Sequence, residues 1–366
     1  GTTGSQDEKT AEASAKGFNG NISVKVTIEG NKLKAIEAKG EEETLNIGTT
    51  AREVMPERMV ERNSLDVDVV SGATITSYSI ISAAKQALEE LNIDPEDLVA
   101  VELADIANEP VTTDVLVIGG GGAGIGATLA AREEGKEVVL LEKLDVLGGN
   151  TALSGGVFTR GAAEGDPEGS MSSEDLYDFF VQETKGKADP DVIKAYLDNS
   201  VDTQKWAFNM GSGVPDTQLF PVKPDNIMAI QALNDGKANG QMLMAPMIEE
   251  VNSSGADIRI GHAVTELIVE DGAVVGAKAL RNDGKVQEFY AKNGVVLATG
   301  GFPSSKEFLA KYSSEGAENA YTRASVGTTG DALKFAEEIG ADIKFGEDWD
   351  GIGTTVQKGN PFGGIS

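Results

Sequence analysis

A chain of 366 residues is long enough for two or three domains with a sizeable buried core. Its 59 Asp and Glu residues outnumber 31 Lys and Arg residues, and the net charge of −28 argues against binding to nucleic acids or anionic membranes. The chain has no cysteine, which excludes disulfides, thiolate metal sites and c-type haem attachment, and we expect no metal site.

The first residues are small and polar and show no periodicity. We therefore expect residues 1–16 to form a disordered tether. The sequence starts without methionine and without a signal peptide, which is typical of a mature exported protein whose leader has been removed. We expect a location at the cell surface, with or without a lipid anchor, or in the periplasm.

Residues 17–92 show the pattern of a small α+β domain. Ile22–Ile28 alternates polar and apolar residues, a turn follows at Glu29–Asn31, and Leu33–Ala38 returns as a second strand. The segment Tyr78–Leu91 places its apolar residues on one face of a helix.

The segment Asp68-Val69-Val70-Ser71-Gly72-Ala73-Thr74 precedes that helix. Ser71 and Gly72 predict a turn whose N–H groups could face phosphate oxygens, whereas Thr76 and Ser77 could cap the helix without any ligand. The segment resembles the flavinylation motif of FMN-binding domains found in sodium-pumping quinone reductase subunits and many extracellular reductases. The resemblance implies an FMN joined through a phosphoester to Thr74, with Ser71, Gly72 and Ala73 beside it. It also implies a separate flavin transferase, and Thr76 as the fallback acceptor.

Residues 93–110 are acidic and contain Pro95 and Pro110, so we interpret them as a linker. Val115–Ile118 then predicts a buried parallel strand and Ile125–Glu134 an amphipathic helix. In the glycine-rich turn between them, Gly119 permits a tight bend and Gly121 lets a pyrophosphate approach the backbone. Gly124 allows the helix to pack closely on the strand.

Glu142 follows the second strand, Val138–Leu141, about 20 residues after the first glycine, where a carboxylate can accept from ribose hydroxyls. A glycine-rich turn alone could be purely structural. Together with two strands, a helix and an acid, it predicts a Rossmann-like dinucleotide-binding domain over residues 111–301.

Residues 161–250 form a helical excursion from this domain, with helices expected over Glu174–Glu183 and Val192–Phe208. Asp271-Gly272 and Asp283-Gly284 then punctuate a β-meander that leads to a buried strand at Gly294–Ala298. The fold class is α/β: a Rossmann-like dinucleotide-binding domain preceded by a small α+β domain.

Two further segments carry a family resemblance, Gly148–Gly156 and Val295–Phe302. From residue 111 to 366 the chain resembles the FAD-binding flavoproteins of fumarate reductases and succinate dehydrogenases, a family that includes urocanate reductases and ketosteroid dehydrogenases. The resemblance implies a Rossmann-like FAD-binding domain preceded by the small α+β FMN-binding domain. It also implies that residues 302–366 begin a substrate capping domain, so that the chain reads as truncated. The resemblance implies these FAD contacts: Ala123 in the glycine loop, Glu142, Asn150, Thr151, Gly155, Gly156, Val264 at the adenine and Asp331 near the flavin. Val264 could instead be a core residue and Asp331 a helix cap.

Membrane quinone-linked members of this family attach FAD to a histidine near the position of Asn150. The single histidine of this chain, His262, lies far along the sequence, so we expect FAD to be bound non-covalently. We expect His262 itself only to fill the end of a strand.

The resemblance implies hydride transfer from FAD to the C=C bond of an α,β-unsaturated carboxylate that serves as terminal electron acceptor. FMN would supply FAD with electrons from a membrane or extracellular donor. The family's catalytic arginine is expected beyond Ser366, so we assign no catalytic residue, neither Arg160 nor Arg323.

Residues 345–355 lack the His-Pro-Thr of fumarate-type members, which disfavours fumarate relative to urocanate or another enoate. Trp349 and the acids around it could serve a larger cationic or aromatic substrate, or could belong to a surface loop. Two alternatives stay open, a ketosteroid-dehydrogenase-like flavoenzyme and a non-catalytic two-flavin electron carrier.

Overall fold

The N-terminal unit is built on a three-stranded antiparallel sheet in the order β1-β2-β3. The computed structural model describes residues 8–44, 47–102, 108–184, 188–210, 216–222, 227–234, 237–313, 315–320 and 322–343. The sheet consists of β1 (Glu8–Lys16), β2 (Asn21–Glu29) and β3 (Lys32–Lys39). The alternating apolar residues of β2 are fully buried: Ile22, Val24, Val26 and Ile28. One face of this sheet is therefore the core face.

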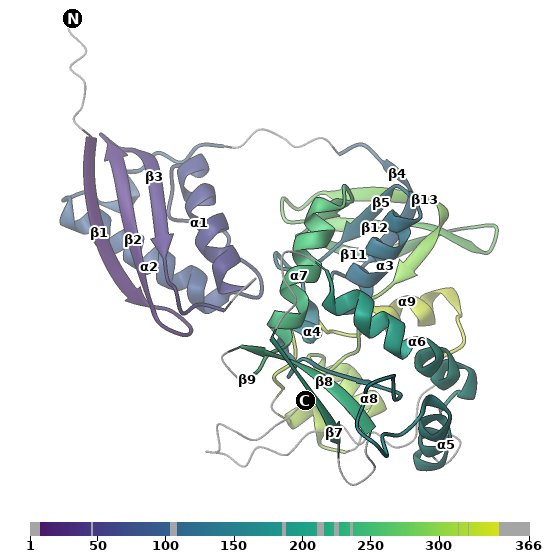
Figure 1. Ribbon diagram of the computed structural model, residues 1–366. Coiled ribbons are helices and arrows are strands. Elements are labelled where there is room, and N and C mark those ends of the chain that lie inside the picture. The colour runs from purple at the N-terminus through teal and green to yellow at the C-terminus, as the bar shows by residue number, and fades with distance from the viewer. Residues whose placement is uncertain are drawn as a thin grey trace, which may run out of the picture.

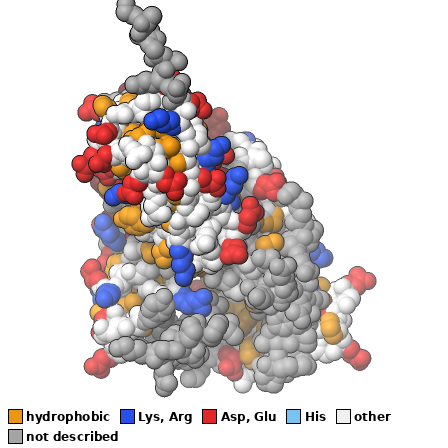
Figure 2. Space-filling model, turned by 90° about the vertical axis from the view of Figure 1, so that its left-hand side faces the viewer, with side chains coloured by type: hydrophobic (Ala, Val, Ile, Leu, Met, Phe, Trp, Pro, Cys, Tyr) orange, Lys and Arg blue, Asp and Glu red, His pale blue; other side chains and the backbone are white. Residues whose placement is uncertain are grey.

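Two helices cover that face, α1 (Gly48–Arg62) and α2 (Thr74–Glu90) (Figure 1). Helix α2 packs on β1 and β2, while α1 packs on β3. Acidic side chains, with some Lys and Arg among them, spread over the face of the molecule in Figure 2.

The expectation of a disordered tether is wrong for residues 8–16, which form β1 and pair with β2 along its whole length. Ala11, Ala13 and Ala15 pack against the core, and the polar residues between them face outward. This is the period-two pattern of a half-buried strand. The pattern is hard to recognise in the sequence because the buried positions are alanines, which are only weakly hydrophobic. Residues 1–7 lie outside the described residues.

The larger unit is organised by a six-stranded sheet in the order β10-β5-β4-β13-β12-β11. Its four parallel strands are β10 (Asp257–Arg259), β5 (Val138–Leu141), β4 (Val111–Ile118) and β13 (Val286–Leu297). Antiparallel strands β12 (Ala273–Arg281) and β11 (His262–Glu270) extend it. The structure thus has the expected architecture, an α/β domain after a small α+β domain.

Strand β13 joins the two halves of this sheet. It pairs antiparallel with β12 and parallel with β4, with an irregularity between Ala291 and Gly294. Helices α3 (Gly122–Glu133) and α7 (Gly240–Ser253) pack together over one face. The parallel strands end where α3 begins, and that edge holds the site described below.

The excursion contains α5 (Ser173–Glu183) and α6 (Pro190–Phe208), close to the expected helices. It is not purely helical, because β7 (Asp216–Val222), β8 (Ile227–Asn234) and β9 (Lys237–Ala238) form a sheet with β6 (Val157–Arg160). The remaining elements are η1 (Pro95–Asp97) in the linker, α4 (Gly149–Leu153), α8 (Lys306–Tyr312), η2 (Ala317–Asn319) and α9 (Asp331–Ile339). Among the described residues no helix is long and apolar enough to cross a membrane.

The contact between β4 and α3 gives a direct test of the fold. A Cβ placed on Gly124 would lie 1.7 Å from the carbonyl oxygen of Gly119, whereas one on Gly126 of the same helix would meet nothing within 4 Å. We expect Gly124→Ala to lower the free energy of unfolding by about 1–3 kcal/mol, because backbone must move. Gly126→Ala should raise it by about 0.5–1 kcal/mol, because alanine has less chain entropy to lose. Urea unfolding of both variants measures the difference, and equal stabilities would contradict this reading of the loop.

Candidate functional site: a dinucleotide cradle and an adjoining flavin motif

The glycine loop turns tightly at the end of β4. Gly119 has φ of +108°, and a Cβ there would lie 2.4 Å from the carbonyl oxygen of Ala298, the residue that follows the neighbouring strand β13. Gly121, the residue before α3, is different, because its closest neighbour would be Gly149 Cα at 3.9 Å. The space in front of Gly121 and Ala123 belongs to a cavity, toward which the N-terminus of α3 opens. Free N–H groups at a helix N-terminus suit a pyrophosphate.

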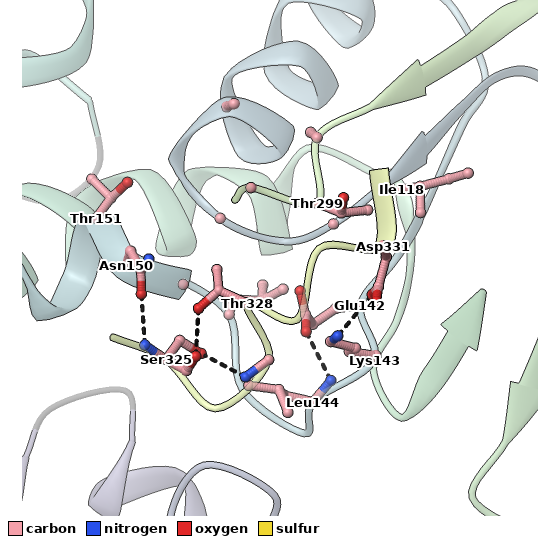
Figure 3. A pocket seen from close by; sticks show the side chains of 18 of the residues that line it. Ile118, Glu142, Lys143, Leu144, Asn150, Thr151, Thr299, Ser325, Thr328 and Asp331 are labelled. Atoms are coloured by element: carbon pink, nitrogen blue, oxygen red, sulfur yellow. Dashed lines mark hydrogen bonds and ion pairs between the residues drawn. The ribbon is translucent and has the colours of Figure 1, made fainter. Parts of the chain in front are cut away.

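Glu142 closes the other side of this loop. Its Oε2 accepts a hydrogen bond from the backbone N–H of Gly120 at 2.7 Å. Its Oε1 accepts from the backbone N–H of Leu144 at 2.8 Å (Figure 3). Burial raises the pKa of the Glu142 carboxyl above its ordinary value, and these two hydrogen bonds oppose that shift. The side chain lines the cavity, at the position where ribose hydroxyls would lie.

Helix α4 brings Asn150 and Thr151 to the same cavity. The Asn150 side-chain oxygen accepts from the backbone N–H of Ser325 at 2.6 Å, which ties α4 to the loop before α9. Gly155 and Gly156 are not among the lining residues. A Cβ on Gly156 would lie 2.7 Å from the carbonyl oxygen of Asn239, so this glycine permits a close approach of two backbones.

Val264 on β11 and Asp331 at the start of α9 both line the cavity. Asp331 is the first residue of α9, and the N-cap is Gly330, which provides no side-chain cap. The Asp331 carboxylate instead pairs with Lys143 Nζ at 2.7 Å and accepts from the hydroxyl of Thr329 at 2.8 Å. The structure thus brings Gly119, Gly121, Ala123, Glu142, Asn150, Thr151, Val264 and Asp331 to one cavity, whereas Gly124 does not line it.

Sequence reasoning missed two charged or titratable residues here. Lys143 donates to both Thr329 and Asp331, and nothing in the motif pointed to it. His262, the first residue of β11, also lines the cavity, which the sequence did not predict. Its Nδ1 lies 2.8 Å from the carbonyl oxygen of Ile260, its ring meets Phe289 edge-on, and burial lowers its pKa.

Arg160 and Arg323 differ in their surroundings. Arg160 is 5% exposed, and its guanidinium makes a two-pronged contact with Asp166 at 2.6 and 2.9 Å. The hydrogen bonds from Arg160 lower the pKa of the Asp166 carboxyl. Arg323 is exposed and does not line the cavity. No group of acidic or histidine side chains suited to a metal ion occurs within the described ranges.

The flavin motif of the N-terminal unit forms a turn followed at once by helix α2. The N–H of Ala73 bonds to the carbonyl of Val70 at 2.9 Å, and Gly72 has φ of +94°. Helix α2 therefore starts at Thr74, not at Tyr78 as expected, and its N-cap is Ala73. Thr76 and Ser77 lie inside the helix and do not cap it.

The two threonines of this motif differ in access. Thr74 is exposed. Thr76 is 2% exposed, and its hydroxyl donates to the buried carboxylate of Glu43 at 2.6 Å. Only Thr74 presents its hydroxyl to a reagent in solution.

One cavity of about 600 Å³ connects the two units. Most of its lining comes from the parallel-strand edge, α4, and the loop before α9, while Ile47 and Gly72 come from the N-terminal unit. The glycine cradle, the open helix N-terminus and a carboxylate at the ribose position fit a dinucleotide such as FAD. The fold and site therefore define a flavoprotein with two adjoining flavin-binding units.

Comparison with known proteins gives this class a family. Residues 114–348 match the FAD binding domain family and residues 17–89 match the FMN-binding domain family. The chain belongs to the FAD binding domain family, whose members related to this chain include reductases of the fumarate reductase type.

Three relatives show how far the similarity extends. The chain is 32% identical to a urocanate reductase from Eggerthella lenta, over 90% of this chain and 55% of that protein. It is 27% identical to an NADH:acrylate oxidoreductase from Vibrio harveyi, over 90% and 39%. An NADH:fumarate oxidoreductase from Klebsiella pneumoniae is 29% identical, over 87% and 34%. The chain thus spans about half or less of these relatives.

Two solved structures resemble the larger unit. A 3-ketosteroid-Δ4-(5α)-dehydrogenase from Rhodococcus jostii has a TM-score of 0.57 at 26% identity, over 63% of this chain and 55% of that one. The open conformation of a flavocytochrome c3 fumarate reductase has a TM-score of 0.54 at 25% identity, over 63% and 40%.

The raised pKa of Glu142 predicts a pH-dependent site. Protonation removes an acceptor for ribose hydroxyls, so FAD affinity should fall as the pH is lowered, starting above the range of an ordinary glutamate. Glu142→Gln should bind FAD more weakly at neutral pH and lose this pH dependence, because its amide does not titrate there. Fluorescence titration of FAD into flavin-free protein across the acidic range measures both. A pH profile shared by the wild type and Glu142→Gln would assign the titration to another group.

Proposed function

We propose that this chain delivers electrons from an FMN attached to Thr74 to a non-covalently bound FAD and then, as hydride, to the C=C bond of an α,β-unsaturated carboxylate. The observation that carries the proposal is the shared cavity. Gly72, two residues before Thr74, lines the same space as the glycine loop and Glu142. When bound, FAD supplies the hydride chemistry, and the chain supplies position, charge and exclusion of water.

Attachment at Thr74 is supported by the contrast between the two threonines. Phosphoester formation requires a transferase to reach the hydroxyl. Thr74 is exposed at the first position of α2, whereas the hydroxyl of Thr76 is buried and held by Glu43. Thr74 is therefore the acceptor we favour over Thr76.

Non-covalent binding of FAD is supported by the surroundings of Asn150. An amide occupies the position at which quinone-linked relatives carry a histidine, and that amide is engaged with the Ser325 backbone. His262 also lines the cavity, but it is the first residue of β11 and not part of the Asn150 segment, and its Nδ1 lies 2.8 Å from the carbonyl oxygen of Ile260.

The reductase class is supported by the extent of the matches. The reductases of urocanate, acrylate and fumarate match 87–90% of this chain, including the FMN-binding unit. A 3-oxosteroid 1-dehydrogenase from Mycolicibacterium smegmatis matches 64% of it. We therefore favour an enoate over a steroid. The preference for urocanate over fumarate depends on residues 345–355, which include Trp349. These residues lie outside the described residues.

The partners in the proposal are a membrane or extracellular electron donor and a flavin transferase for maturation. Export to the cell surface or periplasm belongs to the same proposal, because a covalent FMN is retained where a dissociated one would be lost by dilution. Mass spectrometry of the N-terminus of the native protein tests export. An unmodified N-terminus typical of a cytoplasmic protein would count against it.

The attachment site makes a simple prediction. In protein matured with the transferase, Thr74→Ala should abolish the FMN that stays with acid-denatured protein and leave FAD that denaturation releases. Thr74→Ser should restore attachment, since it retains a hydroxyl, and Thr76→Val should leave it intact, since that hydroxyl is buried. In-gel flavin fluorescence and peptide mass spectrometry measure the adduct. An adduct that persists in Thr74→Ala and disappears in Thr76→Val would move the site to Thr76.

The reaction class is tested on the full-length protein. We expect a chemically reduced dye to be oxidised anaerobically by urocanate or a cinnamate-type acid, more slowly by fumarate, and not by a 3-ketosteroid. Thr74→Ala should lose activity with donors that need FMN and keep it with a small dye that reduces FAD directly. Oxidation by none of these acceptors would favour the electron-carrier alternative, and oxidation by the steroid alone would favour the dehydrogenase.

A further inference from the structure

Asp145 is a buried carboxylate at the boundary between the two units, outside the dinucleotide fingerprint. It lies three residues after Glu142 and is 3% exposed. Its Oδ2 accepts a hydrogen bond from the backbone N–H of Ser71 at 3.0 Å. Its Oδ1 accepts from the side-chain amide of Asn282 at 2.8 Å and lies 3.4 Å from Nη2 of Arg58.

These three partners come from both units. Ser71 belongs to the flavin motif and Arg58 to helix α1, whereas Asn282 lies in the turn between β12 and β13. Arg58 also donates from Nη1 to the backbone carbonyl of Asp68 at 2.8 Å. Asp145 and Arg58 together therefore hold the flavin motif at its first residue and at its turn.

The loop that carries Asp145 is itself fixed to the larger unit. The N–H groups of Gly261 and His262 bond to the carbonyls of Leu144 and Glu142, at 3.0 and 2.9 Å. Glu142 in turn contacts the glycine loop. The loop that carries Asp145 is thus held by backbone hydrogen bonds to the larger unit. The contact between the two units at this loop is the joint.

Apolar contacts complete the joint. Val146 is 8% exposed and packs within the core of the N-terminal unit, and Leu144 packs against the same core. A Cβ on Gly72 would lie 2.9 Å from Cγ2 of Val146, so the motif's glycine is required at this contact as well as by its positive φ. The loop 144–146 is therefore part of the hydrophobic core of one unit and of the backbone of the other.

We propose that Asp145 is a positioning residue for electron transfer, which holds the FMN attachment turn against the FAD cavity. The proposal rests on the function proposed above. Burying a carboxylate is costly unless hydrogen-bond donors surround it. Two of the three donors to Asp145, Ser71 and Arg58, come from the N-terminal unit. The two units must therefore be in contact for the charge of Asp145 to be paired. The same contact fixes Gly72, which lines the cavity and lies two residues before Thr74.

The test compares Asp145→Ala and Asp145→Asn with a control, Asp271→Asn. Asp271 lies in the exposed turn between β11 and β12 with φ of +50°, a conformation that asparagine readily adopts. In the fully flavinylated protein, the rate of electron transfer from FMN to FAD is measured after flash photoreduction. We expect Asp145→Ala to slow it by about tenfold or more, as a loss of about 1.4 kcal/mol of docking energy would. Asp145→Asn, which keeps the acceptor for Ser71, should be intermediate, and the control should match the wild type.

A second readout needs no flavin. Since the chain has no cysteine, Lys85→Cys and Lys136→Cys place one spin label on each unit without background labelling. In the flavin-free protein, the distance distribution between the labels should be narrow with Asp145 and broader in Asp145→Ala. Wild-type transfer rates in Asp145→Ala overturn the proposal, and so does slow transfer with an unchanged distance distribution.

The two proposals fail in different ways. Wild-type protein that carries no FMN on Thr74 after maturation would defeat the proposed function, and the label distances would still report on the joint. Protein that carries both flavins and is unaffected by loss of Asp145 would defeat only the positioning role.

Discussion

The close approach of helix α3 to strand β4 is the constraint on which the rest of the site depends. Since Gly124 has no side chain, the helix can begin against the carbonyl of Gly119, and its free N–H groups then point over the carboxyl edge of the sheet. Glu142 can reach the N–H of Gly120 only because the two strand ends lie side by side at that edge. Every other element of the cavity, from α4 to α9, is placed around this edge.

Two buried carboxylates and one half-buried carboxylate hold backbone or side-chain donors in both units. Glu43 holds Thr76, Glu142 holds the glycine loop, and Asp145 holds the flavin motif. In a chain with a net charge of −28, each of these acids requires specific donors once it leaves water, which makes its position well defined. The free-energy cost of removing a carboxylate from water therefore favours the one arrangement in which its donors surround it.

The sequence predicted the parts of the fold that have strong local signals. Strand β5 has the predicted bounds, and β4, α3 and the meander lie close to their expected positions, because glycine turns and apolar runs mark them clearly. Strand β1 was missed because its core residues are alanines, and α1 because it starts with Gly-Thr-Thr and contains Pro56. The glycine loop, Glu142 and α4 could be read from a motif. Lys143, His262 and Asp145 could not, since their roles depend on contacts with residues distant in the sequence: Asp331, Phe289 and Ser71.

The linker, residues 93–110, is anchored at its middle and near its C-terminal end. The N–H of Val101 bonds to the carbonyl of Arg62 in the first unit, and the Asn108 side chain donates to the carbonyl of Val286 in the second. The chain between these two anchors can span at most roughly 25 Å when fully extended. If the joint at Asp145 opened, the linker would keep the two units tethered, at an effective concentration of each for the other in roughly the millimolar range. Separation would therefore be a brief excursion, and recapture would be independent of how dilute the protein is.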